Sequence, residues 1–142
     1  MTCTFFGHRD TPHTIKEELK NKLIHLIDCE DVTHFLVGNN GNFDSLVQKV
    51  LKEISKERNK VTYSIVLSSI RERSISDAQE KTVFPEELET TPPRFAISRR
   101  NDWMIKHSDM IVCYTKYKIS NSYKFIEKGA KKGLKIINLA DQ

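Results

Sequence analysis

The chain has 142 residues, a formal net charge of +4 and 38% hydrophobic residues, values typical of a single domain with a buried core. No apolar run approaches the roughly 18 residues that a membrane-spanning helix requires. The first six residues pass directly into an expected strand, without the charged and apolar regions of a secretory signal. We therefore expect one cytoplasmic domain, residues 1–142, with no membrane partner.

The cysteines show no spacing typical of a disulfide framework or a zinc site. They stand at three scattered positions, Cys3, Cys29 and Cys113, and the five histidines are equally scattered. We interpret the cysteines as small buried side chains in a reducing compartment. The sequence thus predicts no metal site and no bound cofactor.

Lysines are concentrated in the last quarter of the chain, at Lys116, Lys118, Lys124, Lys128, Lys131, Lys132 and Lys135. A surface for nucleic acid is one interpretation of such a cluster, and the solvated face of a helix is the other. Aromatic residues do not alternate with these lysines, as a platform for stacked bases requires. We therefore expect an anionic small molecule rather than a nucleic acid as the partner.

Apolar and β-branched segments alternate with segments of helical period along the chain. The expected strands are Cys3–Phe6, His34–Val37, Val61–Leu67, Met110–Tyr114 and Lys135–Leu139. The expected helices are Ile15–Ile27, Phe43–Ile54, Ser98–His107 and Ser122–Lys132. This order predicts a single Rossmann-like α/β domain, with a five-stranded, mostly parallel sheet, helices on both faces and the first strand at its centre.

Three local signals mark the ends of the expected helices. Thr14 and Glu17 have the spacing of a capping box at the start of the first helix. Asn42 is a candidate N-cap for the second helix. Gly133 is well placed as the left-handed residue that ends the last helix.

One long connection, Ser68–Ala96, does not fit a minimal strand–helix repeat. It carries Arg71, Arg73 and three prolines, and it has no sustained period. A connection of this length inside a compact domain is usually functional or partly disordered. Because it leaves the carboxyl end of the third strand, we expect it to lie over the ligand edge of the sheet.

Ligands of open α/β sheets bind outside the carboxyl ends of the strands, where this chain places three loops. They are residues 7–10, 38–44 and 115–122. In the second loop, Gly38 and Gly41 allow a close approach to a ligand, and the asparagines between and after them offer amide donors and acceptors. The helix that follows directs free N–H groups toward this loop. A simple strand-to-helix turn capped by Asn42 explains the same residues without any ligand.

Arg9 in the first loop has two interpretations. An arginine beside a strand end can hold a phosphate or carboxylate with two hydrogen bonds. A surface ion pair with Asp10 explains it equally well. Further along the chain, Trp103 and Met104 are expected in the core rather than as groups that stack on a ligand.

Three blocks of this sequence, Cys3–Arg9, Gly38–Asp44 and Arg94–Met104, together resemble YpsA-like proteins of the SLOG superfamily. That superfamily also includes the LOG phosphoribohydrolases and the DprA fold. The resemblance covers nearly the whole chain and implies a Rossmann-like domain that binds nucleotides or molecules derived from them. It also implies a homo-oligomer, because LOG relatives commonly form dimers.

The LOG signature allows a comparison of catalytic residues. Arg100 and Met104 match its first half, an Arg-Lys-x-x-Met segment, with asparagine in place of the lysine. Its second half, Gly-Gly-x-Gly-Thr-x-x-Glu, falls on Ser120–Glu127, where Glu127 matches but all three glycines and the threonine are missing. Side chains at those positions narrow a phosphate cradle, so we expect binding rather than cleavage.

We therefore expect a protein that binds a nucleotide-derived molecule, of the ADP-ribose or cyclic-nucleotide type, at the carboxyl edge of the sheet. It would act without catalysis, as a sensor or a sequestering protein in bacterial defence or phage counter-defence. The expected ligand contacts are Gly7, His8, Arg9, Gly38, Asn39, Asn40, Gly41, Asn42, Phe43, Asp44, Arg99, Arg100, Asn101, Ser120, Asn121 and Ser122.

Two alternative functions stay open. The first is a LOG-like hydrolase of an N-glycosidic bond, in which Arg100 positions the substrate and Glu127 is the general base or stabilises an oxocarbenium-like centre. The second is a DprA-like accessory protein that binds nucleic acid through the C-terminal lysines.

Overall fold

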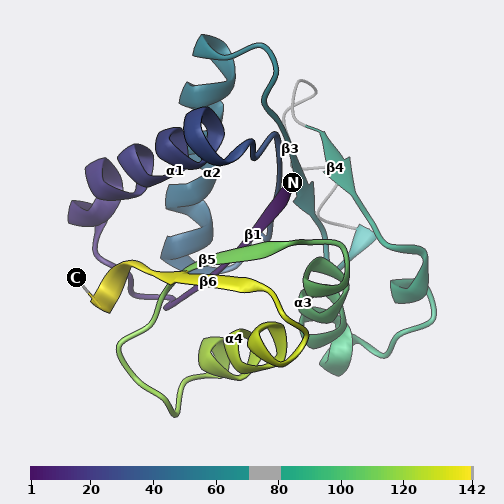
Figure 1. The fold of residues 1–142 in the computed structure, drawn as a ribbon. Helices are drawn as coiled ribbons and strands as arrows, with labels where there is room; N and C mark the ends of the chain where they lie inside the picture. The colour runs from purple at the N-terminus through teal and green to yellow at the C-terminus, as the bar shows by residue number, and fades with distance from the viewer. Residues whose placement is uncertain (71–80, 142) are drawn as a thin grey trace.

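The structure, a computed structural model, describes residues 1–70 and 81–141. Its strands in this part of the chain are β1 (Thr2–Gly7), β2 (His34–Val37), β3 (Thr62–Val66), β4 (Thr82–Val83), β5 (Met110–Tyr114) and β6 (Lys135–Asn138). Its α-helices there are α1 (Lys16–Glu30), α2 (Gly41–Glu57), α3 (Ala96–Lys106) and α4 (Asn121–Lys131). The strands form one parallel sheet in the order β4-β3-β2-β1-β5-β6 (Figure 1).

The predicted α/β fold is confirmed, with β1 inside the sheet between β2 and β5. The chain first adds strands on one side of β1 as far as β4, and then crosses to the other side for β5 and β6. The strand order therefore reverses between β1 and β5. None of the described helices has the length and the apolar character needed to cross a membrane.

The sheet has six strands rather than the five that the sequence predicts, because β4 lies inside the long connection. β4 pairs with β3 through Ile65–Thr82 and Val66–Val83. Two residues are too few to leave a periodic pattern, so only the pairing with β3 reveals this strand. Two short 3-10 turns, Glu86–Leu88 and Pro93–Phe95, then lead into α3. Arg71 and Arg73 lie outside the described residues.

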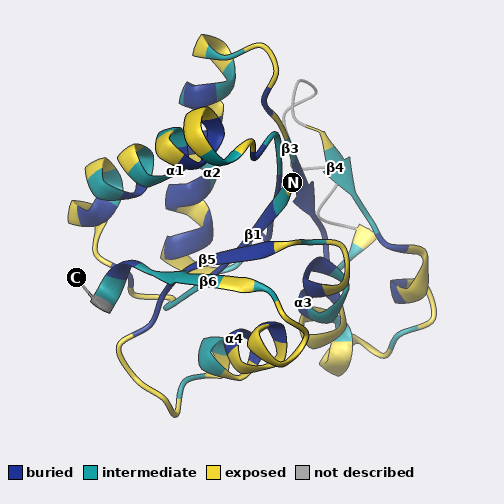
Figure 2. Cartoon of the chain, viewed as in Figure 1, coloured by how far each residue is buried: buried dark blue, intermediate teal, exposed yellow. Residues whose placement is uncertain are grey.

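Helices cover both faces of the sheet, α1 and α2 on one and α3 and α4 on the other (Figure 1). In β1, Cys3 and Phe5 join the core beneath α1 and α2, while Phe6 joins the core beneath α3 and α4. The inner strands β1, β2, β3 and β5 are mostly buried, the edge strands β4 and β6 are less so, and the helices expose their outer faces (Figure 2). Burial on both faces accounts for the continuous apolar runs of the strands.

The expected helix ends are confirmed at one place and wrong at two. Gly133 has a φ of 89° just after α4, as predicted. Thr14 does not cap the first helix, because it lies within a 3-10 turn and Ile15 occupies the N-cap position of α1. Asn42 is not the N-cap of α2 either, because the helix begins one residue earlier, after Asn40.

Two interpretations of single side chains need correction. Cys3 and Cys113 are buried as expected, and burial raises the pKa of the Cys3 thiol. Cys29, in contrast, is exposed on α1. Met104 lies in the core as predicted, whereas Trp103 is only partly buried: it packs against the same core, and its ring lies 4.2 Å from the His107 ring.

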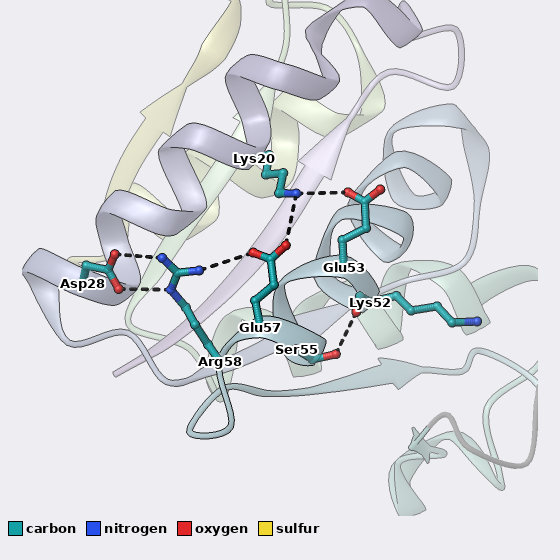
Figure 3. Close-up of polar contacts among 7 residues, drawn as sticks. All are labelled: Lys20, Asp28, Lys52, Glu53, Ser55, Glu57 and Arg58. Carbon is teal, nitrogen blue, oxygen red and sulfur yellow. Dashed lines mark hydrogen bonds and ion pairs between the residues drawn. The ribbon is translucent and has the colours of Figure 1, made fainter.

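Ion pairs connect the outer faces of α1 and α2 (Figure 3). Lys20 lies 3.6 Å from Glu53 and 3.9 Å from Glu57, and Arg58 lies 3.1 Å from Asp28. The Arg58 guanidinium holds the pKa of the Asp28 carboxyl below its usual value. These groups are solvated, so we assign the stability of the α1–α2 pair to the apolar core beneath them.

Replacing Phe43 by alanine should lower the free energy of unfolding by about 3–5 kcal/mol, because a fully buried ring that packs on Phe5 would leave a cavity. Replacing Arg58 by glutamine, which removes solvated ion pairs, should have a far smaller effect. Urea denaturation of both variants measures the difference. Comparable losses in the two variants would contradict this account of the core.

Candidate functional site

An open cleft of about 810 Å³ lies at the carboxyl end of β1. The loops after β1 and β2 form its edge, and residues of α3 and α4 form its walls. The cleft therefore lies where the strand order reverses, the usual ligand site of open α/β sheets. Its volume is in the upper part of the range of about 300–1,000 Å³ seen in small-molecule sites.

Three tight contacts hold this edge together. A Cβ on Gly7 would lie 2.3 Å from the ring of Phe43, so only glycine fits there. The hydroxyl of Ser122 donates to the Gly7 carbonyl at 2.8 Å, and the Asn42 N–H donates to the Arg9 carbonyl at 2.9 Å. The end of β1 is thereby fixed against the starts of both α2 and α4.

The glycines of the second loop are expected to allow close approach of a ligand. The groups that lie closest to them are side chains and backbone of the protein itself. Gly41 has a φ of +89°, and a Cβ there would lie 2.9 Å from Arg9 Cα. A Cβ on Gly38 would lie 2.8 Å from Asp44 Oδ2 and 3.0 Å from Arg100 Cζ. These glycines therefore serve the packing that shapes the cleft.

The buried Arg100 guanidinium joins α3 to the loop between β2 and α2. Only 2% of Arg100 is exposed. Its Nε and Nη2 donate to Asn101 Oδ1 at 3.2 and 3.1 Å, and its Nη1 donates to Asn39 Oδ1 at 3.0 Å. The Asn40 amide, with its oxygen turned toward Arg100, accepts from Nη1 at 3.0 Å. This arginine thus lines the cleft with much of its hydrogen-bonding capacity directed to protein groups.

Asp44 supplies the negative charge beside this guanidinium. Burial raises the pKa of its carboxyl from 3.8 to about 6, while the charge of Arg100 and the N–H of Asn40 limit the rise. Asp44 Oδ2 accepts the Asn40 N–H at 3.0 Å. At neutral pH the carboxyl is therefore mostly ionised, and it balances the charge of Arg100 within the protein.

His8 connects the first loop to the loop between β5 and α4. Its Nε2 accepts the Lys116 N–H at 2.8 Å, which leaves the ring proton on Nδ1. Its ring also lies 5.4 Å from the Tyr117 ring. His8 therefore helps to fix the mouth of the cleft as well as lining it.

Residues Ser120, Asn121 and Ser122 form the start of α4. The Ser120 hydroxyl donates to the Tyr117 carbonyl at 3.0 Å and accepts the Tyr123 N–H at 3.2 Å, as an N-cap does. Asn121 is exposed, and the Ser122 hydroxyl is bonded to β1. Glu127 lies on the exposed surface of α4 and lines the cleft.

Positive charge dominates the lining. The basic lining residues are Arg9, Arg94, Arg100, Lys124, Lys128 and Lys131, and the acidic ones are Asp44 and Glu127. Arg94 and the α4 lysines are not among the ligand contacts expected from the sequence. The signal for the lysines is their i, i+4, i+7 spacing, which puts them on one helix face. Lys128 is paired with Asp102 at 2.9 Å, across from α4 to α3.

The structure brings most of the predicted contacts to the cleft. The predicted residues that line it are Gly7, His8, Arg9, Asn40, Asp44, Arg100, Asn101, Ser120, Asn121 and Ser122. Those outside the lining are Gly38, Asn39, Gly41, Asn42, Phe43 and Arg99. Of the latter, Phe43 is a core residue and Arg99 is exposed, while Asn39 acts on the cleft through its bond to Arg100.

No group of three or more His, Cys, Asp and Glu side chains within residues 1–70 and 81–141 has the arrangement of a metal site. Neither a protein-family model nor a curated protein matches the sequence. Function is therefore inferred from the chemistry of the cleft.

Asp44 should make stability depend on pH. Between pH 3.8 and about 6 the folded protein keeps a proton on Asp44 that the unfolded chain has lost. Its contribution to the free energy of unfolding should therefore fall by about 3 kcal/mol as the pH rises through this window. The variant Asp44→Asn keeps an oxygen for the Asn40 N–H and should lack this fall. Urea denaturation from pH 4 to 7 compares the two proteins, and parallel pH profiles would overturn the assignment.

Proposed function

We propose that the cleft binds an anionic molecule derived from a nucleotide, of the ADP-ribose or cyclic-nucleotide type, and holds it without chemical conversion. The excess of basic over acidic side chains in the lining is the observation that carries this proposal. Asp44 balances Arg100, and Asp102 balances Lys128. The net charge of the remaining lining residues is therefore positive.

Four of the basic side chains can meet an anion. Within the described part of the chain, no carboxylate forms an ion pair with Arg9, Arg94, Lys124 or Lys131. Charged N–H donors make their strongest hydrogen bonds with phosphate and carboxylate oxygens. A ligand with phosphate groups thus satisfies the charges that the protein leaves open.

Apolar side chains beside these charges suit a nucleoside. Phe6, Met104 and Phe125 line the cleft, and the rings of Phe6 and Phe125 stack at 5.6 Å. An apolar lining with a few polar groups that set orientation is typical of small-molecule sites. The resemblance to YpsA-like SLOG proteins supports the same class of ligand and supplies a setting: a sensor or a sequestering protein for a nucleotide signal in bacterial defence or counter-defence.

Binding of ADP-ribose, measured by isothermal titration calorimetry, tests the proposal. Lys124→Gln should weaken binding about tenfold, because a charged hydrogen bond to phosphate is lost. Lys118→Gln removes the same charge from an exposed position outside the lining and should change the affinity by less than about twofold. No binding of ADP-ribose, AMP or cyclic AMP to the unaltered protein would overturn the proposal.

Turnover is the competing function, because Glu127 brings a carboxylate to the cleft. Three features favour retention of the ligand. Arg100 is bonded to protein groups, Ser120 and Ser122 are committed to the start of α4, and Glu127 is exposed to water. A carboxylate in water lacks the low-dielectric surroundings in which a general acid or base is tuned.

Incubation of the protein with AMP should therefore release no free adenine, as measured by chromatography. Glu127→Gln should bind ADP-ribose at least as tightly as the unaltered protein, because it removes a negative charge from a basic cleft. Release of adenine by the unaltered protein, lost in Glu127→Gln, would instead establish an N-glycosidic hydrolase.

A further inference from the structure

The cleft extends well beyond the carboxyl edge of the sheet. α4 begins at that edge, where Ser122 is bonded to Gly7, and its last residue, Lys131, still lines the cleft. Lys131 comes nine positions after Ser122, which corresponds to about 14 Å along a helix axis. The binding surface is therefore elongated and follows α4 away from the edge.

Cationic groups stand along this whole length. Arg9 lies in the loop at the edge, and Lys124 lies on the first turn of α4. Lys131 is two turns further along the same helix face, about 10 Å from Lys124 along the axis. Between them, Lys128 is held by Asp102 at 2.9 Å. The open charges of the first loop and of α4 thus form two groups, one near the edge and one at the far end of the helix.

Largely buried apolar side chains line the cleft between these two groups. Phe125 lies on α4 between Ser122 and Lys128, and it stacks on Phe6 of the sheet. Met104 of α3 lines the same cleft. Along α4 the lining runs from Lys124 past Phe125 and the carboxylate of Glu127 to Lys131, so a neutral group suits its middle better than a phosphate.

Resting on the function proposed above, we infer that the natural ligand carries two phosphate groups separated by a nucleoside, as a short dinucleotide does. One phosphate meets Arg9 and Lys124, and the other meets Lys131. A single phosphate concentrates its charge at one place, and so does a pyrophosphate, whose phosphorus atoms share one bridging oxygen. Neither satisfies both ends of a cleft of this length.

Calorimetry with 5′-phosphorylated dinucleotides and their mononucleotides tests this inference. The affinity of pApA is compared with that of AMP, and the affinity of pGpG with that of GMP. Two bases are used so that a preference for one base does not determine the result. In at least one pair, the dinucleotide should bind the unaltered protein about tenfold more tightly. Lys131→Gln should remove this advantage, because it should weaken binding of the dinucleotide more than binding of its mononucleotide. Lys132→Gln, exposed and outside the lining, is the charge-matched control and should keep the advantage.

Every other result of these titrations would overturn the inference, the proposed function or both. Equal affinities for both members of each pair, or equal losses in Lys131→Gln, would overturn the inference while the proposed function stands. No binding of any nucleotide would overturn both. Tighter binding of a ten-nucleotide single strand than of either dinucleotide, with a steep dependence on salt, would replace a small ligand by nucleic acid.

Discussion

A buried charge is the constraint on which the cleft depends. A guanidinium removed from water is costly unless acceptors surround it, and Arg100 is only 2% exposed. Its acceptors come from α3 itself, through Asn101, and from the β2–α2 loop, through Asn39. Because both sets must stay in place, the loop and α3 are fixed relative to each other. One wall of the cleft and part of its edge are therefore set by a single side chain.

The same constraint divides the charges of the cleft into two classes. Arg100 and Asp44 balance each other inside the protein, and Lys128 and Asp102 bridge α4 and α3. These pairs shape the walls. The basic side chains without an ion pair in the described part of the chain, Lys124 among them, lie at the edge of the cleft and along α4. A lysine there has a flexible side chain that can adjust to the position of a ligand. In the proposed function, structure and ligand recognition are thus assigned to different basic residues of one cleft.

Features of the fold that leave a local pattern can be predicted from the sequence, whereas features that depend on tertiary contacts cannot. Local apolar patterns predict the order of strands and helices. Because ligands of open α/β sheets bind at the carboxyl ends of strands, that order also identifies the loops at Gly7 and Asn40 as candidate ligand loops. β4 leaves no pattern because two residues acquire meaning only by pairing with β3. Lys124, Lys128 and Lys131 have the spacing of one helix face. The sequence pattern of a basic helix face is the same whether that face contacts solvent or lines a cleft. Only the position of α3 opposite α4 distinguishes them.

The start of α4 is the feature that most favours the proposal of capture over turnover. Glycines at this point would let backbone N–H groups close around one phosphate. Here Ser120 caps the helix and the Ser122 hydroxyl donates to β1, so these side chains are used within the protein. An anion must then be met by side chains, and α4 supplies them over two turns rather than at one point. Distributed charge favours holding a long ligand, whereas bond cleavage requires groups concentrated on one reacting centre.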